Sequence, residues 1–243
     1  MRTILTIDIG NTAMKACVYE DERLVQSVVG PGADPAGVDT LLAFNTVDGA
    51  AYCCVGRDDR GIACRLRGEH ALPVVEVNAD TPLPIGVDYG SRQTLGADRV
   101  AAAVGAFEPD YPALVVDAGT AVTIDLVADG RFRGGNISPG LRLRFRSLNA
   151  FTSRLPLVGP EGEIPEFGHD TLTAIRAGVV RGLVGELAEA YLTARSNYDD
   201  LKMILTGGDA GILQPMLAAR GVPVTVDAEV VGRGLVRIFN YNN

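Results

Sequence analysis

The first twenty residues alternate between apolar runs and a glycine turn. An apolar run ends in Asp8, the polar residues Gly10-Asn11-Thr12 follow, and a second apolar run covers residues 13–19 before an acidic turn at 20–22. Apolar runs of this length separated by glycine are typical of a strand, a tight turn and a returning strand. We therefore expect a hairpin with a carboxylate near its tip.

The same order recurs in the second half of the chain. Residues 113–116 are apolar and lead into Asp117, Gly119-Thr120 follow, and an apolar run over 121–127 ends in a turn at 128–130. The interval between the copies exceeds the roughly 20–50 residues of solenoid repeats but suits a duplicated domain. The repeat indicates two related α/β halves.

Further periodic segments place helices between the strands, so both halves mix the two kinds of element. The proline- and acid-rich segment 108–112 interrupts the pattern, and we predict one domain over 1–112 and a second over 113–243. The other expected strands are residues 50–55, 73–77 and 203–205, and the expected helices are 38–44, 96–107 and 171–195. Within the last helix, Gly178, Gly182 and Gly185 would permit close packing against a helix of the same chain or of a second copy.

Charge and composition narrow the class of protein. The 243 residues include 22 Lys+Arg and 30 Asp+Glu, a net charge of −8, which argues against nucleic acid as the main partner. No apolar stretch reaches the roughly 20 residues of a membrane span, and the N-terminus lacks a signal-peptide core, so we expect a cytoplasmic protein with no membrane partner. The four cysteines are expected to be reduced and mostly buried, without a spacing that suits zinc.

The two glycine turns are candidate phosphate loops. Glycine lets backbone N–H groups approach an anion, and Asn11, Thr12 and Thr120 add small side-chain donors. An ordinary hairpin turn is the alternative for either loop alone. Asp8 and Asp117 at the strand ends could each hold a divalent cation beside a phosphate or simply cap the turn.

A third carboxylate opens the expected helix at residue 96. Asp98 there has a simple structural explanation, because the positive end of a helix favours an acid. The Asp98-Arg99 pair, however, offers a proton acceptor for an alcohol and a donor for a carboxylate or phosphate, and Gly96 would let a substrate approach.

Four motifs in this order resemble those of type III pantothenate kinases, over residues 5 to about 178. They are Asp8-Ile9-Gly10-Asn11-Thr12 with Lys15, Gly96-Ala97-Asp98-Arg99, Asp117-Ala118-Gly119-Thr120-Ala121, and Gly134-Gly135-Asn136-Ile137-Ser138-Pro139-Gly140-Leu141. The resemblance implies two duplicated ribonuclease-H-like domains with mixed sheets around a nucleotide cleft, as in acetate and sugar kinases, heat-shock ATPases and actin. It also implies phosphorylation of pantothenate by ATP in coenzyme A biosynthesis, by a homodimer.

The resemblance also assigns roles to residues. Asp98 becomes the base for the pantothenate hydroxyl, Asp117 the site of K⁺ or NH₄⁺ in place of a divalent ion, and Mg²⁺ comes with ATP near Asp8. The residues implied in ATP binding are Asp8, Ile9, Gly10, Asn11, Thr12, Ala13, Met14, Lys15 and Thr120. Those implied in pantothenate binding are Tyr89, Gly96, Ala97, Asp98, Arg99 and Thr171.

Some of these assignments have structural alternatives. Tyr89 could be a partly buried aromatic at a loop edge, and Thr171 a helix N-cap. Residues 134–140 could form a turn rather than an active-site wall. Ser91-Arg92 replace the Asn-Pro pair usual in the family after the tyrosine.

Two other functions share parts of this pattern. One is a relative of the family that acts as a transcriptional accessory factor, which should have lost a catalytic carboxylate. The other is a kinase of another small alcohol, such as a sugar kinase with a cysteine-rich zinc loop. Asp8, Asp98 and Asp117 are all present and the zinc loop is not, so the pantothenate kinase is favoured.

Overall fold

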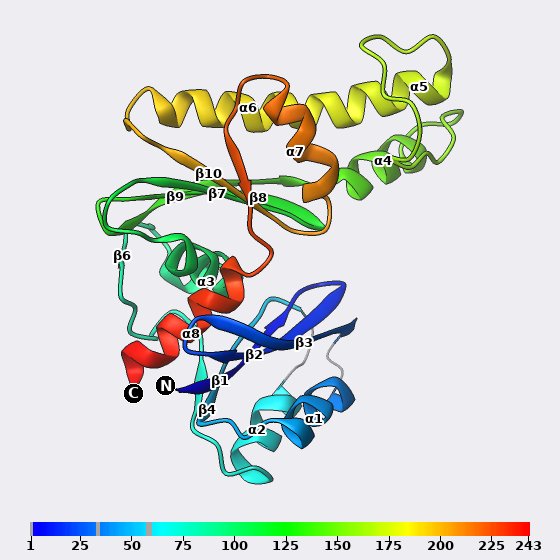
Figure 1. Cartoon of the computed structure of the whole chain (residues 1–243). Coiled ribbons are helices and arrows are strands. Elements are labelled where there is room, and N and C mark those ends of the chain that lie inside the picture. Colours follow the sequence, from blue (N-terminus) through cyan, green and yellow to red (C-terminus); the bar gives the residue numbers. More distant parts are fainter. Residues whose placement is uncertain (1, 33–34, 57–59) are drawn as a thin grey trace. The chain divides into compact units, whose positions relative to one another are not determined.

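The computed structural model describes residues 2–32, 35–56 and 60–243. The chain divides into two compact units. Unit 1 comprises Met1–Phe107, Asp129–Arg133 and Glu229–Asn243, and unit 2 comprises Glu108–Ala128 and Gly134–Ala228. Each unit is an α/β layer structure built on its own sheet (Figure 1).

Unit 1 contains a five-stranded sheet of order β3-β2-β1-β4-β5. Its strands are β1 (Thr3–Ile9), β2 (Ala13–Glu20), β3 (Arg23–Pro31), β4 (Gly49–Cys54) and β5 (Val74–Glu76), and its helices are α1 (Pro35–Phe44), α2 (Arg60–Gly68), α3 (Ala97–Ala106) and α8 (Val230–Asn242). β1 pairs antiparallel with β2 and parallel with β4, and β4 pairs parallel with β5. The short strand β6 (Gly86–Val87) and a 3₁₀ turn (Arg92–Thr94) lead into α3.

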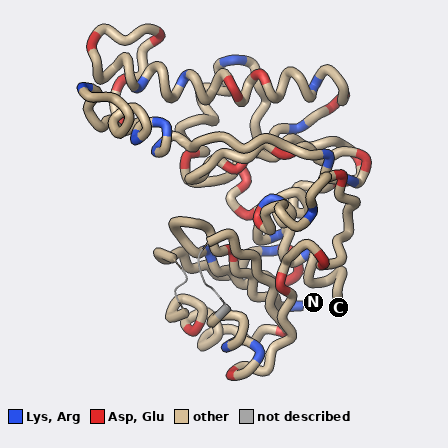
Figure 2. Tube along the Cα trace, turned by 180° about the vertical axis from the view of Figure 1, so that it is seen from behind, with Lys and Arg blue, Asp and Glu red and all other residues tan. Residues whose placement is uncertain are grey.

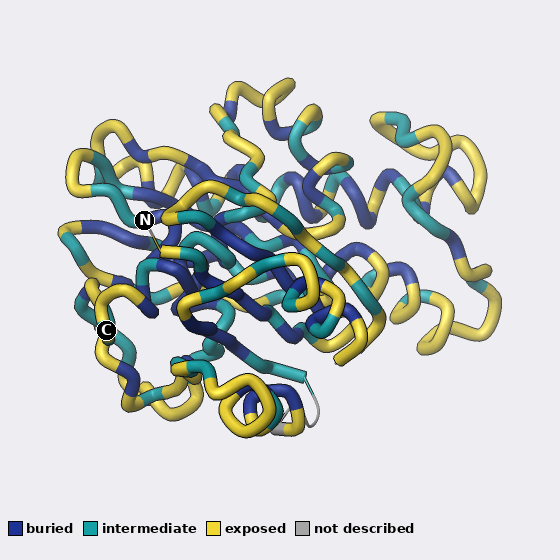
Figure 3. Tube along the Cα trace, turned by 60° about the horizontal axis from the view of Figure 1, so that its bottom comes forward, coloured by how far each residue is buried: buried dark blue, intermediate teal, exposed yellow. Residues whose placement is uncertain are grey.

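Helices cover both faces of the unit 1 sheet. α1 and α2 lie on one face, and α3 and α8 lie on the other (Figure 1). Figure 3 shows long stretches of buried residues in the middle of the trace. In unit 1, Leu5, Ile7, Ile9 and Met14 belong to one apolar core with side chains of α1 and α2. This core fixes the end of β1, where the segment Gly10-Asn11-Thr12 begins.

The contact between α3 and α8 depends on two glycines. A Cβ atom at Gly234 would overlap the carbonyl oxygen of Ala101, and one at Gly105 would overlap that of Val230. The Arg237 guanidinium donates to the carbonyl oxygen of Phe107 at 2.8 Å, satisfying an otherwise unpaired group at the end of α3. α8 therefore completes unit 1 although it comes last in the sequence.

Unit 2 repeats the strand order of unit 1. Its strands are β7 (Ala113–Ala118), β8 (Ala121–Ala128), β9 (Arg131–Pro139), β10 (Lys202–Thr206) and β11 (Val224–Val226), and its helices are α4 (Leu141–Ala150), α5 (Thr171–Arg176), α6 (Gly182–Arg195) and α7 (Ala210–Ala218). The second sheet has the order β11-β10-β7-β8-β9-β6. Read from β9 to β11 this matches β3-β2-β1-β4-β5, so the predicted duplication is confirmed.

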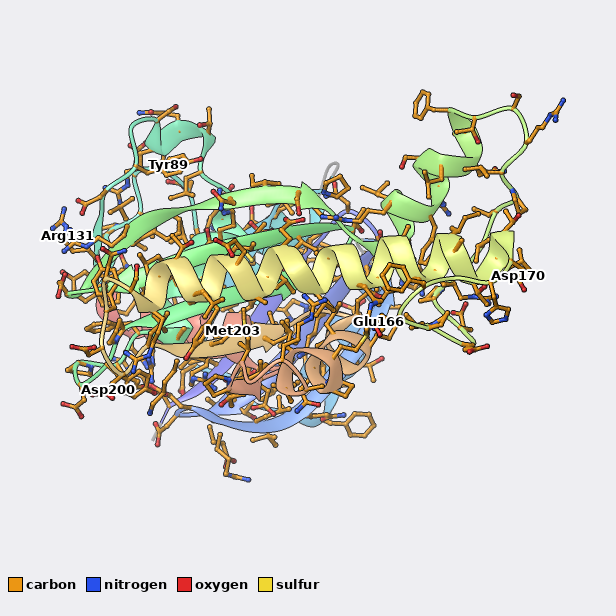
Figure 4. All side chains as sticks on the ribbon, turned by 90° about the horizontal axis from the view of Figure 1, so that it is seen from above. Tyr89, Arg131, Glu166, Asp170, Asp200 and Met203 are labelled. Carbon is orange, nitrogen blue, oxygen red and sulfur yellow. The ribbon has the colours of Figure 1, made fainter. Side chains whose placement is uncertain are left out.

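The predicted elements are largely present, with different ends. The helical pattern over 171–195 is one run of α5, a π-helical turn (Ala177–Arg181) and α6, which Figure 4 shows along one face of the second sheet with Asp170 at its start. Residues 134–140 are not a turn, because β9 runs through to Pro139. α8, which the predicted division at 112/113 placed with the second half, belongs to unit 1 because it packs on α3.

The cysteines are free thiols, as expected, but they are not mostly buried. Cys17 and Cys53 are buried, Cys54 is half-buried and Cys64 is exposed. Cys64 is exposed because its position on α2 faces away from the sheet, whereas Ile62, Ala63 and Leu66 face the core.

Candidate active site

Asp8 lies one residue before the last pair of the β1–β2 hairpin. It pairs with Lys15, Ile9 pairs with Met14, and Gly10 donates its N–H to the carbonyl oxygen of Ala13 at 2.9 Å. Asp117 has the matching place in the other unit, where Ala118 makes the last pair with Val122. The duplicated aspartates thus occupy equivalent positions in the two sheets.

The Asp8 carboxylate is largely shielded from solvent and accepts a hydrogen bond from a neighbouring strand. The thiol of Cys53 on the adjacent strand β4 donates to Asp8 Oδ1 at 3.4 Å. The pKa of Asp8 is raised to about 6: burial is the largest cause, the Cys53 hydrogen bond opposes it, the negative charge of Asp98 adds to the rise, and Lys15 lowers the pKa. An ionised Asp8 is therefore costly until a cation approaches it.

Asp98 lies in the first turn of α3. The backbone N–H of Arg99 donates to Asp98 Oδ1 at 2.8 Å, which orients the carboxylate. Burial raises the pKa of this carboxyl, and the charge and N–H of Arg99 lower it. A Cβ atom at Gly96 would lie 2.5 Å from Asp98 Oδ1, so glycine is the residue that leaves this carboxylate in place. Asp8 and Asp98 belong to the same unit and interact electrostatically.

Arg99 is a buried cation between aromatic rings. Only 4% of the residue is exposed, and its guanidinium carbon lies 5.7 Å from the ring centroid of Tyr89 and 5.6 Å from that of Phe132. The two rings meet edge to face at 5.9 Å. Tyr89 is half-buried, as its structural alternative expects, and its role in pantothenate binding stays a prediction.

The loop after Tyr89 has its own hydrogen bonds. Arg92 donates to the carbonyl oxygen of Thr81 at 3.2 Å, and the hydroxyl of Thr94 donates to the carbonyl oxygen of Ser91 at 3.0 Å. The Ser91-Arg92 sequence therefore supports an ordered 3₁₀ turn without an asparagine and a proline at these positions.

The residues of the first candidate phosphate loop and its flanks differ in how far their side chains are exposed to solvent. Asn11, Thr12 and Ala13 are exposed and Lys15 is half-buried. The side chains of Ile9 and Met14 are in the core, with exposures of 1% and 0%. Of the predicted ATP contacts, these two could therefore act only through their backbone.

The second loop lies in unit 2 and packs against two other glycine segments. Gly119 donates its N–H to Ala121, and Gly140 donates to Thr120 at 3.0 Å, so the end of the glycine-rich stretch lies directly on the loop. Gly207, at φ +90°, approaches so closely that a Cβ atom would lie 2.5 Å from Asp117 Oδ1. Only glycine suits both that backbone conformation and that space.

Thr171 is the first residue of α5 and is exposed. It is not the N-cap of the helix. Asp170 has that role, because its carboxylate accepts the N–H of Thr173 at 2.8 Å and Thr173 completes a capping box. Tyr89, Gly96, Ala97, Asp98 and Arg99 belong to unit 1, and Thr171 belongs to unit 2.

Three features of the site were missed from the sequence. They are Cys53 beside Asp8, Phe132 beside Arg99, and the segment Thr206-Gly207-Gly208-Asp209 at the end of β10. The last could have been found, because two glycines and an aspartate after a buried strand repeat the signal of the other loops.

Charges of both signs are intermingled along the described trace of each unit (Figure 2). Among the described residues there is no group of three or more His, Cys, Asp or Glu side chains that could hold a metal by themselves. None of the helices described is long and apolar enough to cross a bilayer.

Comparison with known proteins identifies the family. A family model for type III pantothenate kinase matches residues 4–192. The type III pantothenate kinase of Phocaeicola vulgatus is 38% identical over 244 residues and covers 98% of each chain. The structure of a Campylobacter jejuni protein assigned to the Baf family of transcriptional activators matches with a TM-score of 0.64 at 23% identity, over 98% of each chain. A ROK family glucokinase from Streptomyces griseus matches with a TM-score of 0.56 at 14% identity, over 98% of each chain. These two structures confirm the predicted fold class, and the sequence matches show that the chain belongs to the type III pantothenate kinase family.

Proposed function

We propose that the chain transfers the γ-phosphoryl group of ATP to the primary hydroxyl of pantothenate, forming 4′-phosphopantothenate in coenzyme A biosynthesis. The observation that carries this function is the Asp98-Arg99 pair at the start of α3, in a chain of this family. It supplies a proton acceptor and a fixed cation on one helical turn.

Asp98 is proposed as the catalytic base. The pantothenate hydroxyl oxygen forms a bond to the γ-phosphorus, the bond from that phosphorus to the bridging oxygen of ADP breaks, and the hydroxyl proton passes to the Asp98 carboxylate. Phosphoryl transfer depends mainly on positioning and electrostatics, so a carboxylate that is oriented by the Arg99 N–H suffices. Its raised pKa makes it a better proton acceptor than an exposed aspartate.

Asp8 and the loop Gly10-Asn11-Thr12 are proposed to bind the ATP phosphates together with a divalent cation, Mg²⁺. A carboxylate oxygen is the ligand that Mg²⁺ prefers, and the half-buried Asp8 gains from a cation because its own charge is poorly solvated. When bound, Mg²⁺ neutralises charge on the phosphates.

Asp117 is proposed to hold the K⁺ or NH₄⁺ ion, and Thr120 to contact ATP. An Asp117 carboxylate oxygen and the carbonyl oxygen of Ala118 both lie close to Gly207, and oxygen atoms of these kinds are ligands for a hard cation. This assignment, like that of Thr171 to pantothenate, comes from the resemblance in sequence.

The test is ATP-dependent phosphorylation of pantothenate by the purified protein in potassium and in sodium buffer. We expect turnover with potassium, strong loss with sodium, and loss of more than about 100-fold in kcat for Asp98→Asn. Asp117→Asn should remove the difference between the two ions. Folded protein that binds ATP but phosphorylates no pantothenate in either buffer would overturn the proposal.

We also propose that two copies of the chain associate through the surface around α4 and α5. Large apolar side chains are exposed there: Leu143, Phe151, Leu157, Phe167 and Leu172. On the following helical turns a Cβ atom at Gly178 or Gly182 would meet nothing within 4 Å, which leaves room for a second copy. Light scattering should give a dimer for the native chain and a monomer for Phe151→Ser with Phe167→Ser; a native monomer at micromolar concentration would refute the association.

A further inference from the structure

The turn between β8 and β9 belongs to unit 1 although its strands form part of the second sheet. Unit 1 includes Asp129–Arg133. Asp129 and Gly130 both have positive φ, 53° and 68°, as in the tight turns that match the twist of a hairpin. The start of β9 is therefore held in a defined orientation next to the residues that precede α3.

Backbone pairing joins this hairpin end to the segment before Tyr89. β6 pairs in parallel with β9, Gly86 donates its N–H to Gly130 at 2.9 Å, and Asp88 donates its N–H to Phe132 at 2.8 Å. The same backbone hydrogen bonds therefore fix both Phe132 and Asp88, the residue before Tyr89.

Side chains reinforce the same connection. The Asp88 carboxylate accepts from Arg131 Nε at 2.8 Å and from an Arg133 guanidinium nitrogen at 2.8 Å, and Asp129 accepts from Arg133 at 2.6 Å. The ion pairs are exposed, and they set the path of the segment more than they add stability. Figure 4 shows Tyr89 and Arg131 at the same end of the molecule.

The paired segments each place one aromatic ring beside the buried Arg99 guanidinium: Phe132 lies on β9, and Tyr89 follows β6. Phe132 is 1% exposed, and its ring and that of the half-buried Tyr89 both lie within 6 Å of the Arg99 guanidinium carbon. A planar cation over two ring faces loses freedom to rotate and is attracted to both rings. Arg99 is thus set in one orientation before any substrate arrives.

We propose that Phe132 is a positioning residue which, with Tyr89, fixes the Arg99 guanidinium to receive the carboxylate of the substrate. The inference rests on the proposed function, because pantothenate carries one carboxylate at the end opposite its primary hydroxyl. Arg99 and Asp98 are consecutive on α3, so an orientation imposed on the guanidinium also sets where the hydroxyl lies relative to the base. A carboxylate held by a preoriented arginine makes directional, charge-assisted hydrogen bonds.

The variant that tests this inference is Phe132→Leu, which keeps an apolar side chain but removes the ring. We expect the KM for pantothenate to rise about three- to tenfold, the size of a lost cation–π contact with some loss of orientation, while the KM for ATP stays within about twofold. The matched control is Phe239→Leu, a buried phenylalanine of α8 in the same unit that lies against Gly49. It should leave both KM values unchanged.

A second substrate separates positioning from general packing. Pantothenyl alcohol has a neutral hydroxymethyl group in place of the carboxylate, so its KM should be the same for Phe132→Leu and the unchanged protein. A rise of equal size for both substrates, or none for pantothenate, would overturn the inference.

If Phe132→Leu does not fold, Tyr89→Leu at the half-buried ring tests the same contact with the same two substrates. It should also raise only the pantothenate KM, and equal effects on both substrates would again overturn the inference. Should the unchanged protein fail to phosphorylate pantothenate at all, the proposed function fails, which is a different result from an active protein that is insensitive at Phe132.

Discussion

Asp8 should reduce the stability of the fold that carries it. Its pKa is raised from 3.8 to about 6, chiefly by burial. Such a carboxyl is neutral in both folded and unfolded chains below about pH 3.8, and stability is lost as the pH rises through about 6, because ionisation is then harder in the folded state. This pKa difference between the folded and unfolded chains corresponds to a loss of ~3 kcal/mol in the free energy of unfolding at high pH. We reduce the loss to ~1–2 kcal/mol because the residue is partly exposed to solvent.

Asp8→Asn removes the charge while keeping an oxygen that accepts from the Cys53 thiol. At pH 8 we expect the Tm of this variant to exceed that of the unchanged protein by ~2–8 °C, since ~1 kcal/mol shifts Tm by ~2–4 °C in a chain of this size. The advantage should shrink at pH 4.5. Thermal unfolding at both pH values without nucleotide or divalent cation measures it.

The matched control for this experiment is Asp110→Asn at an exposed aspartate, which should leave Tm unchanged at both pH values. A stabilisation by Asp8→Asn that is equal at pH 4.5 and pH 8, or a lower Tm at pH 8, would refute the reasoning. The same variant should lose kinase activity, so the charge at Asp8 would be kept for function at the expense of stability.

Substitution by alanine should impair activity at one glycine and stability at another. Gly96→Ala should lower kcat about 10- to 100-fold with Tm within ~2 °C, because the new Cβ atom displaces the Asp98 carboxylate and leaves the core alone; a normal kcat would contradict it. Gly234→Ala should destabilise the fold by ~3 kcal/mol or more, because its Cβ atom overlaps the Ala101 backbone, and urea unfolding measures this. Gly61→Ala is the control on an open helical surface and should be neutral or slightly stabilising.

The repeated hairpins could be predicted because their signal is local. An apolar strand, an aspartate and a glycine turn determine where a hairpin forms, and Asp8 and Asp117 indeed occupy matching register positions. The pair Asp98-Arg99 was predictable for the same reason, because both residues lie in the first turn of one helix.

What could not be predicted depends on contacts between distant segments. Phe132 is an apolar residue in a largely polar strand, and nothing near it in sequence indicates that it meets Arg99. Cys53 reaches Asp8 through the parallel pairing of β4 with β1, whose register the sequence alone does not determine. The apolar face of α8 likewise indicates burial but not that α3 is the partner.

The packing of α8 on α3 has a consequence for how the protein is made. Arg237 and Phe107, which the contact joins, are 130 positions apart in the chain. At a synthesis rate of ~5–20 residues per second, α3 waits ~6–26 s for its partner, with the face around Gly105 uncovered. A nascent chain must therefore hold an unfinished first unit while the second unit is made, and α8 then completes that first unit.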